Sequence, residues 1–374
     1  MRVNYHCHFG QPTGYARAAH DNIMALLSVG VSVKIWPFDS YACIDGLESR
    51  YMKLTNYLAA DDDDPFKDEG VHVYHETPGR LKELLDIDAL PGPAVAFTTW
   101  ETSQLPEEFV DALLSFESVI VPSVFCQHAL SKSGVKSEVV PHTLDFDFWE
   151  PSDKPKASPF TFYTIGAWNE RKNVGALLKA YLAAFRRDDE VKLVIHSIDP
   201  DIFETKRILS QSGIPEGQLP RLLITDHFLS EAALLSIHQE SHCFVSMTRC
   251  EGWGLGAFEA LACGNPVLMP GYGGQWDFLP TQSHKVQYTT TPCFPSDRIV
   301  IRDDVVTGIR NVPKGVACDQ DWAEPSIHDM KVLMRRVFTS RGEDILPIRK
   351  KLGSLYNYNK VGERLASVLA YTGK

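Results

Sequence analysis

Two carboxylates flank a glycine-rich turn in the stretch 250–267, CEGWGLGAFEALACGNPV. Glu251 lies just before the turn, and Glu259 lies about one helical turn beyond it. Three glycines leave room for a ligand beside the backbone: Gly252, Gly254 and Gly256. The free amides of the helical turn favour a phosphate, and carboxylates accept hydrogen bonds from hydroxyls. The pattern favours a nucleotide-sugar-like ligand; the alternative is an ordinary strand-to-helix turn with surface glutamates.

A second segment, 166–173, GAWNERKN, brings positive charge to the same kind of position. It follows an expected strand and precedes an expected helix, and ligands of α/β sheets bind at the carboxyl ends of neighbouring strands. Cations at a helix N-terminus are mildly unfavourable, so a nearby anion explains Arg171 and Lys172 better than a solvated helix start does. The two cations could neutralise a pyrophosphate leaving group without a metal.

The elements that must position these residues alternate between strand and helix in both halves of the chain. The first half begins with a strand at 2–8, a helix at 15–28 and a strand at 31–36. After the proline-rich stretch 150–159, which is the best linker candidate, the alternation restarts with a strand at 160–165. Such alternation predicts two α/β units with parallel sheets.

Composition narrows the classes of function. The chain has 374 residues and a net charge of −11, so no global positive field gathers nucleic acid or anionic lipid. No apolar run approaches the roughly 18–20 residues that cross a bilayer, and the polar start is unlike a secretory signal. We therefore expect a cytoplasmic protein. The eight cysteines form no C-x-x-C pair and are expected as reduced thiols, and the acidic run 61–64 is expected as a solvated loop.

The spacing of Glu251 and Glu259, E-x7-E within EGWGLGAFEALACGNPV, resembles the signature of retaining glycosyltransferases of family 4, which have the GT-B architecture. The segment 166–173 resembles that family's phosphate-gripping segment, and 99–106, with Trp100 and Glu101, resembles a W-E segment of one of its branches. The sequence departs from the family pattern at Gly256-Ala257, where many members carry proline, and at Thr143-Leu144-Asp145 in place of Gly-Val-Asp. Neither departure removes a charged group.

The resemblance implies an α/β fold with two Rossmann-like domains facing across a cleft, and a C-terminal helix that returns to the N-terminal domain. The expected boundaries are 1–150 for the acceptor-binding domain, 151–355 for the donor domain and 356–374 for the returning helix. The implied reaction transfers a sugar from a nucleoside-diphosphate sugar, foremost a UDP-sugar, with retained anomeric configuration. It needs no cofactor and no metal.

The resemblance also assigns roles to individual positions. Arg171 and Lys172 would hold the donor diphosphate, Glu251 would bind hydroxyls of the transferred sugar, and Glu259 would bind the ribose. With Glu101, which would face the sugar and the acceptor, the first three form the expected catalytic set. The remaining donor-binding candidates are Gly14, Gly166, His227, Phe228, Gly252, Trp253, Gly254 and Leu255.

On the acceptor side the candidates are His6, His8, Tyr15, Trp100 and Glu101. His6 and His8 are two apart on a strand, so both could point to one face. A structural role, a contact with donor or acceptor, and metal binding all stay open for them.

Other functions remain as alternatives: a GT-B nucleotide-sugar epimerase, or a non-catalytic nucleotide-sugar-binding subunit. A phosphorylase would need pyridoxal phosphate. A dehydrogenase is disfavoured because the loop 10–14 lacks G-x-G-x-x-G.

The acceptor stays undetermined among soluble small molecules, glycans, proteins and a modified DNA base, so nucleic acid enters only as a substrate. Membrane docking is not indicated, since the helix 16–28 carries only one Lys or Arg, Arg17. The oligomeric state stays open.

Overall fold

The computed structural model describes residues 1–11, 13–38, 47–59, 69–87, 90–280, 285–293, 299–302, 305–309, 319–341 and 345–372. The chain divides into two compact units. The first unit comprises Met1–Phe146 and Leu352–Lys374, and the second comprises Asp147–Lys351. The sequence placed these boundaries at 150 and 355. The acidic run 61–64 lies outside the described residues.

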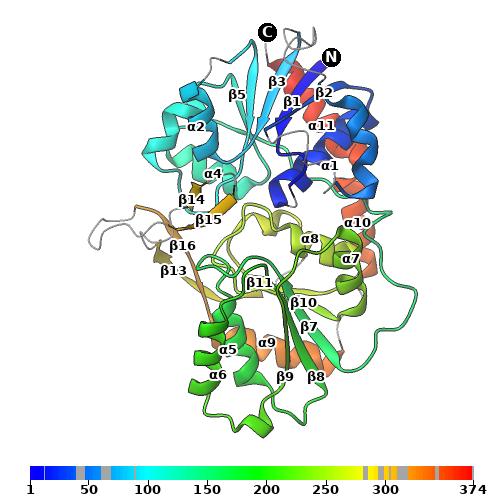
Figure 1. Ribbon diagram of the computed structural model, residues 1–374, viewed down its shortest axis with the longest axis vertical. Coiled ribbons are helices and arrows are strands. Elements are labelled where there is room, and N and C mark those ends of the chain that lie inside the picture. The colour runs from blue at the N-terminus through cyan, green and yellow to red at the C-terminus, as the bar shows by residue number, and fades with distance from the viewer. Residues whose placement is uncertain are drawn as a thin grey trace. The chain divides into compact units, whose positions relative to one another are not determined.

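The first unit is built on a six-stranded parallel sheet with the order β2-β1-β3-β4-β5-β6 (Figure 1). Its strands are β1 (Arg2–Cys7), β2 (Ser32–Pro37), β3 (Val71–His75), β4 (Ala94–Phe97), β5 (Ser118–Val121) and β6 (Glu138–Val139). Its helices are α1 (Gly14–Ser28), η2 (Ser49–Tyr57), α2 (Pro78–Ile87), η3 (Glu107–Phe109), α3 (Val110–Leu114), α4 (Val124–Lys132) and α11 (Tyr358–Tyr371). The expected strand 2–8 therefore ends at Cys7, one residue before His8.

The last helix, α11, belongs to the first unit. Its apolar residues Val361, Leu365 and Leu369 are buried in the same core cluster as residues of α1, and the two helices lie side by side in Figure 1. A Cβ atom at Gly362 would clash with the carbonyl oxygen of Ala25, so glycine permits this close approach. The predicted return of the C-terminal helix is confirmed.

The second unit holds another six-stranded parallel sheet, with the order β12-β11-β10-β7-β8-β9. Its strands are β7 (Phe160–Ile165), β8 (Val191–His196), β9 (Arg221–Thr225), β10 (Cys243–Val245), β11 (Val267–Pro270) and β12 (Lys285–Val286). Its helices are α5 (Val174–Ala184), α6 (Ile202–Gln211), η4 (Glu216–Gln218), α7 (Glu231–Glu240), α8 (Leu255–Ala262), η5 (Gly274–Asp277) and α9 (Ile327–Ser340). Helix α10 (Leu346–Tyr356) runs across the boundary between the units.

Two antiparallel strand pairs interrupt the alternation after β12 and were not predicted from the sequence. One pair joins β13 (Tyr288–Pro292) to β16 (Asp321–Pro325), and the other joins β14 (Ile299–Arg302) to β15 (Val305–Ile309). The apolar core of the second unit lies between its parallel sheet and helices α5 and α9. Two parallel α/β units confirm the predicted fold class.

Candidate functional site

The predicted donor residues of the second unit follow two neighbouring strands. Strands β7 and β10 pair in parallel, so their carboxyl ends meet at one edge of the sheet. Gly166 directly follows β7, and the segment 166–173 leads into α5. The segment 246–254 follows β10 and leads into α8. Sheet topology alone therefore brings the two predicted motifs together.

A left-handed glycine turns the chain into α8. Gly254 has φ 97° and is the N-cap residue of the helix, with no side-chain cap. Its carbonyl oxygen accepts hydrogen bonds from the amides of Ala257 and Phe258, both at 3.1 Å. A non-glycine residue is strained at such a φ, so the sequence needs glycine here. The amides of the first helical turn form the end of the helix that attracts anions.

Arg171, Lys172 and Glu251 form one cluster beside this turn. Lys172 Nζ lies 2.6 Å from Glu251 Oε1, and Arg171 Nη1 lies 3.2 Å from Glu251 Oε2. Arg171 Nη1 also donates to the carbonyl oxygen of Cys250 at 2.6 Å. The side chain of Glu251 is 8% exposed, against 18% for Arg171 and 24% for Lys172. We call Arg171 and Lys172 the cation pair.

The cation pair sets the ionisation of Glu251. Burial alone raises the pKa of this carboxyl, but the charges of Lys172 and Arg171 outweigh burial. Hydrogen bonds from Lys172 and Thr248 add to this effect and leave the pKa of Glu251 well below its ordinary value. Glu251 is therefore a carboxylate at neutral pH, which suits an acceptor of hydroxyl hydrogen bonds.

The segment that carries the cation pair is fixed by neighbours that the sequence did not single out. The amide of Lys172 donates to Asn169 Oδ1 at 2.9 Å. The amide of Arg249 donates to the carbonyl oxygen of Arg171 at 2.7 Å. Asn173 ends the segment in the left-handed region, with φ 51°, where α5 begins. Neither Asn169 nor Arg249 follows a spacing rule that would have marked it in advance.

The side chain of Arg249 connects three segments of the second unit. Its Nη1 donates to Glu170 Oε1 at 2.9 Å and to the carbonyl oxygen of Glu170 at 2.5 Å. Its Nε donates to Glu324 Oε2 in β16 at 2.8 Å. The guanidinium also lies over the ring of Trp322, 5.1 Å from its centroid. Arg249 thus ties the segment before the cation pair to a strand that lies far along the chain.

Glu259 is buried inside α8, next to a histidine of α7. Its side chain is 2% exposed, and its Oε2 lies 3.4 Å from Nε2 of the fully buried His238. His238 in turn contacts Tyr163 through Nδ1 at 2.7 Å. The two carboxylates of the E-x7-E pattern therefore have different surroundings, because Glu251 precedes α8 whereas Glu259 is covered by α7. The expectation that both carboxylates flank one ligand at the turn stays a prediction.

Other predicted donor residues divide into exposed and buried ones. Phe228 is 65% exposed in the loop after β9, and the ring of His227 lies 5.9 Å from that of His196, at the end of β8. The amide of Gly166 donates to the carbonyl oxygen of His196 at 3.0 Å. Trp253 is buried, with its ring against Phe258 and Phe278. Gly252 is also buried and Leu255 is half-buried, so the tryptophan packs in the core whereas the loop after β9 meets solvent.

In the first unit, His6 and His8 contact residues of β3 or of the loop that follows it, and a common face for the two stays a prediction. His6 stacks on Tyr74, with ring centroids 4.2 Å apart, and its Nε2 lies 3.0 Å from His72 Nδ1. His8 lies just past β1, and its Nε2 is 2.6 Å from Oε2 of Glu76. Glu76 follows β3, the strand that neighbours β1. Sequence reasoning missed Glu76 because it did not predict β3.

The remaining acceptor-side candidates lie near the carboxyl ends of the strands of the first sheet. Tyr15 is in the first turn of α1, next to Gly14, where that helix begins. Burial raises the pKa of Tyr15, and the carboxylates of Glu76 and Glu101 raise it further. Trp100 Nε1 donates to Thr102 Oγ1 at 2.6 Å and to the carbonyl oxygen of Gln104 at 2.7 Å, which shapes the loop that holds Glu101. A polar cluster thus occupies one edge of the first sheet.

Metal-binding clusters and membrane-spanning helices are both missing from the part of the chain that the structure describes. In that part of the chain no three His, Cys, Asp or Glu side chains are grouped so as to hold a metal ion. Nor does it include a helix with the length and apolar character that a membrane span requires. The described cysteines Cys7, Cys126, Cys243, Cys250, Cys263 and Cys293 are buried free thiols.

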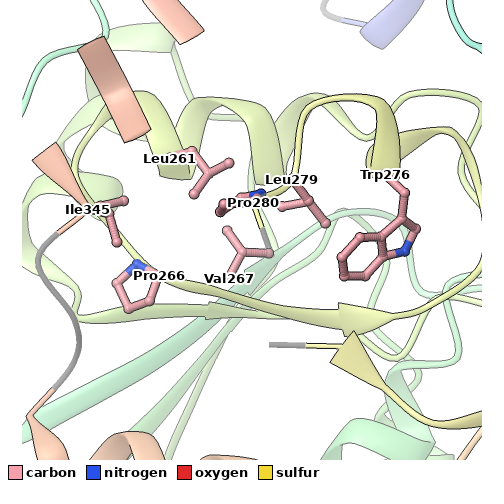
Figure 2. A pocket seen from close by; sticks show the side chains of 7 residues that line it. All are labelled: Leu261, Pro266, Val267, Trp276, Leu279, Pro280 and Ile345. Carbon is pink, nitrogen blue, oxygen red and sulfur yellow. The ribbon is translucent and has the colours of Figure 1, made fainter. Parts of the chain in front are cut away.

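An apolar pocket lies in the second unit (Figure 2). Its lining consists of Leu261, Pro266, Val267, Trp276, Leu279, Pro280 and Ile345. In Figure 2 these side chains come from the end of α8, from the start of β11, from the segment around η5 and, for Ile345, from the residue before α10. The lining carries no carboxylate, amide or cationic group. A sugar or a phosphate would therefore find no polar partner there, and the cation pair remains the stronger candidate site.

Comparison with known proteins identifies the family to which the sequence is similar. A family model described as family 4 glycosyltransferase in conflict systems matches residues 124–318, just over half of the chain. ORF313 of Acidianus filamentous virus 1, an assigned glycosyltransferase, is 24% identical over 242 residues, which are 62% of this chain and 66% of ORF313. The chain therefore spans slightly less than two thirds of that relative.

Solved structures share the fold of the whole chain. HepE of Anabaena in complex with UDP-glucose has a TM-score of 0.65 at 11% identity and covers 99% of both chains. A sucrose-phosphate synthase of Thermosynechococcus elongatus has a TM-score of 0.63 at 12% identity, covering 99% of this chain and 98% of its own. At these identities the likeness concerns architecture.

Proposed function

Since the chain belongs to the family 4 glycosyltransferases of conflict systems, we propose that it transfers a sugar from a nucleoside-diphosphate sugar to a hydroxyl acceptor. A UDP-sugar is the proposed donor, in line with the UDP-glucose bound to HepE. The single observation that carries the proposal is the cluster of Arg171, Lys172 and Glu251 beside the N-terminus of α8. It combines cations and helix amides for a diphosphate with a carboxylate for sugar hydroxyls.

The chemistry proposed for this cluster follows from charge. Breaking the bond between the anomeric carbon and the phosphate oxygen leaves negative charge on the diphosphate. Arg171 and Lys172 would stabilise that charge, as would the amides after Gly254, with no metal ion required. The new bond forms between the anomeric carbon and the acceptor oxygen on the face that the diphosphate leaves. Attack on that face retains the anomeric configuration, and the acceptor proton passes to an oxygen of the leaving diphosphate.

On the acceptor side the proposal relies on the polar edge of the first sheet. Tyr15, Glu101 and the pair of His8 and Glu76 offer hydroxyl, carboxylate and imidazole groups at the carboxyl ends of its strands. Such groups suit a hydroxyl-bearing acceptor, which we propose to be a soluble small molecule, glycan, protein or modified DNA base. The protein is proposed to act in the cytoplasm.

A donor panel tests the proposed function. The purified protein is incubated with nucleoside-diphosphate sugars and pools of acceptors, and release of the nucleoside diphosphate is followed. Arg171→Ala should lower turnover by at least about 100-fold, as for other groups that stabilise transition-state charge. Arg335→Ala is the matched control, because Arg335 forms a half-exposed pair with Asp189 outside the cluster. NMR of the product's anomeric proton reads the stereochemistry. Full turnover by folded Arg171→Ala would refute the proposed role of the cation pair, and an inverted product would refute the retained configuration.

A further inference from the structure

Glu251 is the shared counter-ion of the cation pair. One of its carboxylate oxygens contacts Lys172 Nζ at 2.6 Å, and the other contacts Arg171 Nη1 at 3.2 Å. All three side chains are largely buried, so solvent and salt screen these contacts less than they screen a surface pair. The carboxylate therefore neutralises the same two cations that the proposed donor diphosphate needs.

A diphosphate and the Glu251 carboxylate compete for the charge of these two cations. Both are anions that take charge-assisted hydrogen bonds from Arg and Lys. A carboxylate left near a diphosphate without a cation is disfavoured by repulsion and by its own burial. Binding of the diphosphate must therefore be coupled to a new partner for Glu251, and the hydroxyls of the attached saccharide are donors that can supply it.

We propose that Glu251 is an exchangeable counter-ion. The donor diphosphate displaces it from Arg171 and Lys172, and the hydroxyls of the saccharide then donate hydrogen bonds to its carboxylate. This inference rests on the proposed function and deepens it. After transfer the nucleoside diphosphate carries an additional ionisable oxygen on its terminal phosphate but has lost those hydroxyls. Glu251 then competes for the cation pair again and weakens the hold on the product. The site distinguishes the loaded donor from the spent one, although both present a diphosphate to the cation pair.

Reciprocity makes the competition measurable. If the diphosphate weakens the contacts of Glu251 with the cations, then removing the charge of Glu251 must strengthen the binding of the diphosphate by the same coupling. Glu251→Gln keeps the shape of the side chain and removes that charge. If Glu251 only helped to bind the anion, its substitution would weaken the binding of the diphosphate or leave it unchanged.

The test is calorimetric titration of the full chain with three probes: inorganic pyrophosphate, UDP and UDP-glucose. Glu251→Gln should bind pyrophosphate and UDP on the order of tenfold more tightly than the unmodified protein does. The unmodified protein should prefer UDP-glucose to UDP, and Glu251→Gln should lose that preference. Glu170→Gln is the matched control: it removes the same charge from a nearby side chain, 51% exposed, that contacts Arg249 and is expected to change each affinity less than twofold.

Three results would overturn the inference. They are an unchanged or weaker affinity of Glu251→Gln for pyrophosphate, an equal gain in Glu170→Gln, and equal affinity of the unmodified protein for UDP and UDP-glucose. Circular dichroism and thermal unfolding establish that each variant is folded. If Glu251→Gln does not fold, Glu251→Asp should show a smaller gain of the same sign. Turnover is measured separately, so a protein that transfers no sugar but shows the pyrophosphate difference would refute the proposed function alone.

Discussion

Gly254→Ala separates what the glycine-rich turn contributes to folding from what it contributes to the donor. Gly254 has φ 97°, and an added Cβ would lie 3.5 Å from Gln275 Cβ and 3.6 Å from Glu251 Cγ. These are ordinary van der Waals separations, so the cost to stability comes from backbone strain alone, about 1–2 kcal/mol. For a unit of this size that corresponds to a fall in Tm of roughly 2–8 °C.

The effect on the donor should be larger than the effect on folding. The new methyl group lies against the side chain of Glu251 and beside the amides that begin α8. We expect the affinity for UDP-glucose to fall by about tenfold or more, since a diphosphate there must approach the backbone closely. Calorimetric titration measures the affinity, and thermal unfolding measures the stability of the same preparation.

Gly213→Ala is the matched control. Gly213 also has a left-handed φ, 68°, and an added Cβ would meet nothing within 4 Å. The variant should lose a similar amount of stability and keep the affinity of the unmodified protein for UDP-glucose. If Gly254→Ala keeps that affinity within twofold, or if Gly213→Ala loses as much, the turn is not an anion site and the reasoning is refuted.

Three further outcomes are expected. Arg249→Met should lower the free energy of unfolding by about 1–3 kcal/mol, because it removes the charge-assisted hydrogen bonds of a buried guanidinium to two half-exposed carboxylates. Urea unfolding measures this, and a loss no larger than that of Arg335→Met would contradict it. His142 is buried, and burial lowers its pKa to about 3. As pH falls, this histidine takes up a proton in the unfolded chain before it does so in the folded protein, so stability should fall below about pH 6.5. Urea unfolding from pH 7.5 to 4.5 should show that the free energy of unfolding depends less steeply on pH in His142→Phe than in the unmodified protein. The pKa of Glu251 is also lowered, but this carboxyl ionises in the folded state. Its stabilising contribution is present above the unfolded pKa of about 4.3 and is lost as pH falls further. The difference in stability between the unmodified protein and Glu251→Gln should therefore shrink as pH falls below about 4.3, and acid unfolding of the two proteins measures this.

Parts of the site were readable because they depend on local sequence. The strands β7 and β10, the helix starts after them and the left-handed glycine at 254 follow from apolar patterning and turn chemistry. Parallel pairing then places the two motifs at one sheet edge, so Arg171, Lys172 and Glu251 could be expected together. The antiparallel pairs after β12 were missed because they follow no alternation of strand and helix.

The sequence by itself determined the two α/β units and the charges that gather at the turn before α8, and its family resemblance implied the return of helix α11. Only the tertiary structure decided that Glu251 faces the cation pair whereas Glu259 faces His238, and that Glu76 meets His8. The physical reason is that spacing along a chain fixes which residues share a helix or strand. The partner of a buried charge, however, is chosen by packing between elements that lie far apart in the sequence.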